Sequence, residues 1–276
     1  MQTRTDLARG WRYIRRAPLV YFGLSLIVPL ALVAAFLIFG LQPGRYQFSM
    51  GVASAFAAPL LLILLAGWGF YYFTMMAAVR QNMSADGSTA GFLKVRPGPL
   101  LSIPLAVVLA ILVTLLAMIP IFLVQWLVLT EMQDALFRGA MLGAQRDPAY
   151  FVSFAFLFSF VMSVAGLAIG GYVFAGFMAG PVVSGMRDLG VRRAFGLGAR
   201  VAAAVRGRIF MVLFVPMIVT EIVVMGLEFL FPYQAVALGL TYVSLLTMFM
   251  LPMAALVAIV GEQLESMDSA EAEPAA

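Results

Sequence analysis

The chain has 276 residues, of which 63% are hydrophobic and 11% are charged. Soluble domains carry roughly 25% charged residues, so this composition excludes an ordinary soluble protein and indicates an integral membrane protein. The chain contains no cysteine or histidine. This excludes disulfide bonds, thiolate zinc sites, iron–sulfur clusters and histidine-activated nucleophiles. We therefore expect no cofactor and no metal site.

Six apolar segments are long enough to cross a membrane, and they predict an all-α fold with six transmembrane helices. The predicted spans form one domain over residues 1–260. They run over residues 19–41, 52–79, 100–129, 151–180, 209–231 and 234–260. The remaining tail, 261–276, is acidic and rich in Ser, Ala, Glu and Pro. That composition is typical of disordered segments.

Basic residues are distributed unevenly between the predicted loops, and basic loops stay in the cytoplasm. Five arginines lie in residues 1–18, three basic residues in 80–98 and six in 181–208. The loops on the other side carry only Arg45, Arg138 and Arg146. This partition predicts six spans with both termini in the cytoplasm. The preference for arginine over lysine, with abundant Ala, Gly and Val, is typical of a GC-rich bacterial genome and predicts the bacterial inner membrane.

Two of the basic segments show helical periodicity. Leu7, Trp11 and Ile14 share one face of the first, and Val191, Ala194, Leu197, Val201 and Val205 form a stripe along the second. Both patterns predict amphipathic helices that lie in the membrane interface. Arginines on the other faces are candidate contacts for anionic lipid headgroups: Arg12, Arg15, Arg16, Arg192, Arg193 and Arg200. Alternatively, these arginines act only as topology determinants.

Glu221 lies near the middle of the predicted fifth span, and Glu228 follows seven residues later on about the same face. A charged residue at that depth costs about 2.5 to 3.5 kcal/mol on insertion scales and is a functional candidate by default. The two carboxyls could mark a path for protons or cations. In the alternative, Glu221 is structural and binds a hydroxyl such as that of Ser244 or Thr247.

Four glycines in the predicted fourth span are spaced for close helix packing: Gly166, Gly170, Gly176 and Gly180. The resulting seam could lie within the bundle or between protomers. Alternatively, the glycines line a ligand site or form a hinge. Prolines within the spans predict kinks: Pro29, Pro104, Pro120, Pro216 and Pro252. Kinked helices occur both in transporters and in inert bundles.

The opening ARGWRYIRRAPLVYF, residues 8–22, combines Gly-Trp, a basic cluster and a proline that enters the first span. It resembles the start of a group of bacterial six-helix proteins, which includes the YciC-like proteins and the membrane domain found beside some glycerophosphodiester phosphodiesterases. The Phe-Gly-Leu-Gly connector before the fifth span is similar as well. The resemblance covers the helix plan of nearly the whole chain. It implies a fold plan and no catalytic residues.

The first functional hypothesis is a non-enzymatic membrane protein: a scaffold, an envelope-maintenance factor or a partner subunit. The alternative is a small-solute or ion transporter, or a transporter subunit, that uses Glu221. A membrane enzyme acting on lipid is disfavoured, because neither a nucleophile nor a metal-ligand set can be assembled. Expected partners are membrane lipids and either another membrane protein or a second copy of the chain; no nucleic acid is expected.

Overall fold

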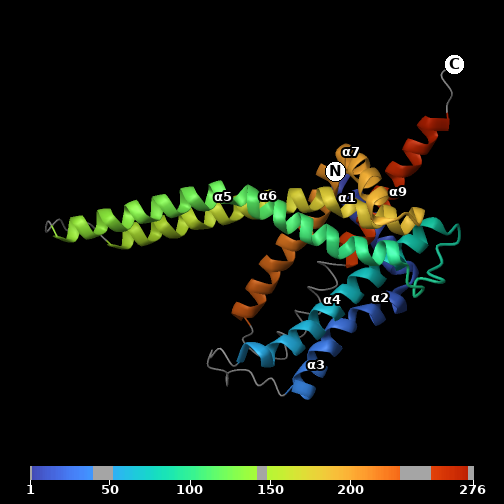
Figure 1. Ribbon diagram of the computed structural model, residues 1–276, viewed down its shortest axis with the longest axis horizontal. Coiled ribbons are helices and arrows are strands. Elements are labelled where there is room, and N and C mark those ends of the chain that lie inside the picture. The colour runs from blue at the N-terminus through green and yellow to red at the C-terminus, as the bar shows by residue number, and fades with distance from the viewer. Residues whose placement is uncertain (1, 40–51, 142–147, 231–249, 273–276) are drawn as a thin grey trace. The chain divides into compact units, whose positions relative to one another are not determined.

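The structure is a computed structural model that describes residues 2–39, 52–141, 148–230 and 250–272 (Figure 1). Every regular element in these ranges is helical, which confirms the predicted all-α fold. The helices are α1 (Gln2–Arg16), α2 (Pro18–Ser25), α3 (Ile27–Phe39), α4 (Val52–Met83), α5 (Pro97–Met141), α6 (Pro148–Arg187), α7 (Val191–Leu230) and α9 (Leu251–Ala272).

Four helical segments among the described residues are long and apolar enough to cross a membrane. They are Pro18–Ala35, Leu60–Met83, Pro97–Asp134 and Leu157–Arg187. These segments overlap the first four predicted spans. Most of the predicted fifth span lies in α7, which combines the basic connector and the span and is kinked at Val205. Most of the predicted sixth span, 234–260, lies outside the described residues.

Prolines set several helix boundaries. Pro18, Pro97 and Pro148 are the first residues of α2, α5 and α6, where the missing N–H costs no helical hydrogen bond. The first span is interrupted at Leu26, between α2 and α3. Pro29 explains where the helix is interrupted. It has no backbone N–H to donate to the carbonyl of Ser25, four residues earlier.

The composition of the acidic tail predicted disorder from residue 261, but the structure shows a helix there. Helix α9 continues to Ala272, which corrects that prediction. Leu264 is buried, and two acidic side chains of the segment form ion pairs: Glu262 with Arg9 and Arg208, and Asp268 with Arg187. Composition alone cannot anticipate these partners, which come from three other helices.

The helices group into two compact units, although the sequence predicted a single domain. The larger unit comprises Met1–Ala106 and Ala175–Ala276, and the smaller one comprises Val107–Phe174. The smaller unit contains the second part of α5 and the first part of α6. Its helices are antiparallel, because Thr114 lies against Gly170 and Met118 against Gly166.

The core of the larger unit lies between α4 and α9. Residues 75–79 of α4 are fully buried, as are Ala254 to Val257 of α9. Many of these residues are alanines, which allow close approach of helices. Helices α1, α2 and α7 pack around this pair, together with the last part of α6. The candidate site lies at the polar end of this bundle.

Candidate functional site

Helix α1 packs directly on α9 through a glycine contact. A Cβ on Gly10 would lie 2.7 Å from the backbone nitrogen of Ala255 and 2.8 Å from the carbonyl oxygen of Leu251. The buried face of α1 consists of Asp6, Gly10 and Ile14. Of the predicted apolar face, Ile14 is buried, whereas Trp11 is 47% exposed. Helix α9 therefore covers a face of α1 that overlaps the predicted apolar stripe only at Ile14.

Asp6 is the most deeply buried charged residue of this contact, with only 1% of its surface exposed. Arg208 of α7 binds it with two hydrogen bonds, from Nε to Oδ2 at 3.1 Å and from Nη2 to Oδ1 at 2.8 Å. The same Nη2 also donates to Oε2 of Glu262 at 3.0 Å. Arg9 of α1 pairs with that carboxylate as well. The four side chains therefore link α1, α7 and α9 in one ion-pair network.

The network shifts the pKa values of two of its members, Glu262 and Arg208. The hydrogen bond from Arg208, with a second from Arg9, holds the pKa of Glu262 below its ordinary value of 4.5. Hydrogen bonding to Asp6, opposed by partial burial and reinforced by Glu262, raises the pKa of Arg208. Both groups are therefore charged near neutral pH, as a charge-assisted network requires.

A second polar network ties α1 and α2 to the end of α4. The Gln81 side chain is nearly fully buried. Its Nε2 donates to the backbone carbonyl of Tyr13 at 3.1 Å, and its Oε1 accepts from the Tyr21 hydroxyl at 2.9 Å. The Tyr13 hydroxyl donates to Oδ1 of the neighbouring Asn82. Burial raises the pKa of Tyr13, so it is a neutral donor.

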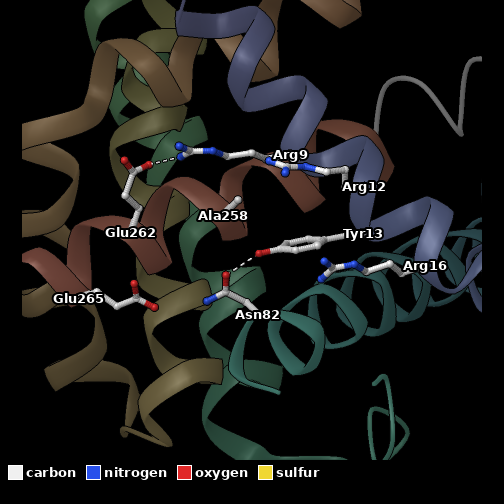
Figure 2. A pocket seen from close by; sticks show the side chains of 8 residues that line it. All are labelled: Arg9, Arg12, Tyr13, Arg16, Asn82, Ala258, Glu262 and Glu265. Carbon is white, nitrogen blue, oxygen red and sulfur yellow. Dashed lines mark hydrogen bonds and ion pairs between the residues drawn. The ribbon is translucent and has the colours of Figure 1, made fainter. Parts of the chain in front are cut away.

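A pocket of about 380 Å³ opens between α1, α4 and α9 (Figure 2). It is lined by Arg9, Arg12, Tyr13, Arg16, Asn82, Ala258, Glu262 and Glu265. Figure 2 shows Arg9 extending toward Glu262 and Tyr13 toward Asn82. Its volume lies in the range of small-molecule sites, about 300 to 1,000 Å³.

The predicted headgroup contacts fall into two groups. Arg12 and Arg16 line the pocket. The other four are exposed on the surfaces of α1 and α7: Arg15, Arg192, Arg193 and Arg200. The structure therefore brings only two of the six predicted arginines together in one site.

The predicted glycine seam of α6 contacts two different helices, α5 and α7. Gly166 and Gly170 lie against Met118 and Thr114 of α5, within the smaller unit. In the larger unit, Gly176 lies against the guanidinium of Arg206, and Gly180 lies against Phe195 and Gly198 of α7. A Cβ on Gly198 would be 2.7 Å from the Gly180 backbone. These contacts pack helices within one chain.

Glu221 and Glu228 lie in α7, but their side chains fall outside the part of the chain that the structure describes. The path for protons or cations that they suggested stays a prediction. In the described ranges, no three acidic side chains meet in an arrangement that could hold a metal ion.

Sequence reasoning missed the residues that build the site: Asp6, Gly10, Asn82, Glu262 and Glu265. The sequence contained one indication of the buried face of α1. Asp6, Gly10 and Ile14 recur every four residues in a basic segment, which places a lone carboxylate, a glycine and an isoleucine on one helix face. The acidic residues of α9 gave no signal, because their composition matches that of a disordered tail.

No protein-family model matches the chain, and no curated protein or solved structure is significantly similar to it. The resemblance to the YciC-like group therefore stays a prediction.

Proposed function

We propose that this chain is a non-enzymatic integral protein of a bacterial inner membrane, acting as a scaffold or partner subunit. The observation that carries the proposal is the ion-pair network of Asp6, Arg9, Arg208 and Glu262. Each member is bound to another member. Charged side chains that join helices to one another are arranged in this way. We refer to this polar end, where α1, α7 and α9 are joined by the network, as the platform.

We further propose six spans. Helix α1 near the start of the chain and α9 near its end pack against each other in one unit. In this proposal both ends lie on the same side of the membrane, which gives an even number of spans. Four candidate spans lie between 18 and 187, and the apolar part of α7 from Ile209 leads outward again. In this proposal a sixth span returns the chain to α9.

The distribution of basic residues supports a cytoplasmic position for the platform, because the connectors at this end carry most of the arginines. Since the chain has no cysteine, a thiol reagent labels only a cysteine that is introduced, and its reaction reports on which side of the membrane that position lies. We expect cysteines replacing Arg4 and Glu271 to react with a membrane-impermeant maleimide only after the cytoplasmic membrane is opened. A cysteine replacing Arg45 should react in intact spheroplasts.

Reaction of the Arg4 and Glu271 positions in intact spheroplasts would overturn the orientation. Reaction of only one of them would overturn the even number of spans. The transport alternative rests on Glu221, and the Glu221→Gln variant tests it independently of topology.

A further inference from the structure

The pocket between α1, α4 and α9 carries charges that the ion-pair network does not use. Arg9 and Glu262 are paired with each other. Among the described residues, Arg12, Arg16 and Glu265 make no ion pair and no side-chain hydrogen bond. Two cations and one anion therefore face the pocket without an ion-pair partner in the part of the chain that the structure describes.

These charges are separated in space. Arg12 and Arg16 are four residues apart on α1, so they project from the same face of that helix. Glu265 lies on the opposite wall, on α9, with Asn82 of α4 between the walls (Figure 2). The Arg16 side chain is further confined by the turn after α4, since a Cβ on Gly87 would lie 3.1 Å from its Nη1. Gly87 has a φ of +69°, which favours glycine.

A ligand that satisfies both walls must carry a negative and a positive group. Two guanidinium groups suit a phosphate, whose oxygens accept charge-assisted hydrogen bonds. A carboxylate suits a primary ammonium, which donates up to three hydrogen bonds. A phosphodiester with an ethanolamine-like arm provides both groups a few bonds apart.

The position of the pocket favours a lipid as the source of these groups. Arg16 immediately precedes the segment Pro18–Ala35, and Asn82 lies at the end of the segment Leu60–Met83. The pocket thus lies where two candidate spans end, which is the level of lipid headgroups. This step rests on the proposed membrane function.

We propose that the α1–α4–α9 pocket binds a zwitterionic phospholipid headgroup, with its phosphate at Arg12 and Arg16 and its primary ammonium at Glu265. The site would anchor a lipid beside the platform and make the packing of α1 sensitive to lipid composition.

The test is a calorimetric titration of the full chain in a nonionic detergent with short-chain dihexanoyl lipids. The ethanolamine lipid should bind about tenfold more tightly than the glycerol lipid, which lacks an ammonium. It should also bind more tightly than the choline lipid, whose quaternary ammonium donates no hydrogen bond. Inorganic phosphate should bind weakly, because it reaches only one wall.

Matched variants separate the two walls. Arg16→Gln should weaken binding of all three lipids, whereas Glu265→Gln should remove the preference for the ethanolamine lipid over the glycerol and choline lipids. Arg4→Gln on α1 and Glu271→Gln on α9 are exposed and lie outside the pocket, so they should leave affinities unchanged. All four positions are exposed, and equal melting temperatures would show that the variants fold.

Three outcomes would overturn the proposal. Equal affinity for the ethanolamine and glycerol lipids would show that Glu265 does not bind the ammonium. An equal loss in Arg4→Gln would show binding to surface charge in general. Binding of inorganic phosphate as tight as that of the lipid would show a free-anion site. Because the titration is made in detergent, it is independent of the cysteine labelling that tests topology.

Discussion

Arg208 donates two hydrogen bonds to the carboxylate of Asp6, from Nε at 3.1 Å and from Nη2 at 2.8 Å. The two residues are 202 positions apart in the sequence. The two side chains join the start of the chain to the beginning of the fifth predicted span. Asp6 is 1% exposed, whereas the Arg208 side chain is 20% exposed. The pair is therefore buried on the acidic side and open to water on the basic side.

Asp6→Ala should destabilise the chain by about 2 to 4 kcal/mol, because removing one partner of a largely buried pair leaves the other charge uncompensated. Glu262 retains a contact with Arg208, which keeps the loss toward the lower end. The measurement is thermal unfolding in detergent. Glu271→Ala on the exposed end of α9 is the control and should cost under about 0.5 kcal/mol. Equal effects would show that the pair contributes nothing specific.

Gly10→Ala should loosen α1 from α9. The new methyl group would meet backbone atoms of Ala255 and Leu251 at 2.7 and 2.8 Å, so a helix must move, at a cost of about 1 to 3 kcal/mol. Gly23→Ala in α2 is a matched control, since its Cβ meets nothing within 4 Å. It should stabilise that helix by about 0.5 to 1 kcal/mol.

Hydrogen exchange should show faster exchange of the amides of α1 and the first turns of α9 in Gly10→Ala, and unchanged exchange there in Gly23→Ala. Unchanged exchange in both variants would mean that α1 and α9 do not pack as closely as the structure has them.

Stability should fall in acid through Glu262. Its folded pKa lies below the ordinary 4.5, so the folded state binds the proton less readily than the unfolded state. The contribution is complete above about pH 4.5 and is lost as the pH falls through the folded pKa. Melting temperatures measured over this range should show a smaller acid-dependent loss in Glu262→Gln than in the unchanged chain.

The effect should be modest and should shrink in high salt, because 47% of the Glu262 side chain is exposed and exposed pairs are screened. Glu271→Gln should keep the full acid dependence. If Glu262→Gln keeps it too, the loss of stability in acid arises from other carboxyls.

Glu221→Gln separates the proposed function from transport. With a structural Glu221, the infrared carboxyl band of the chain in liposomes should not change over the physiological pH range, and the variant should melt like the unchanged chain. A band that changes with pH and is lost in the variant would mean that water or ions reach the membrane centre. That result would favour proton-coupled transport over the scaffold.

The sequence by itself determined the all-α fold, four apolar helices long enough to cross a membrane and the helix starts at Pro18, Pro97 and Pro148. These features depend on local properties: the length of an apolar run, and the fixed φ and missing N–H of proline. The break before Pro29 has the same local cause.

Only the tertiary structure decided which face of α1 is buried and where α9 ends. A buried carboxylate such as Asp6 is stable only beside a cation, and that cation lies 202 residues away. Likewise, the acidic turns of α9 are held by arginines of α1, α6 and α7. The pocket also depends on the tertiary structure, because its walls come from α1, α4 and α9, and no local sequence pattern relates these three segments.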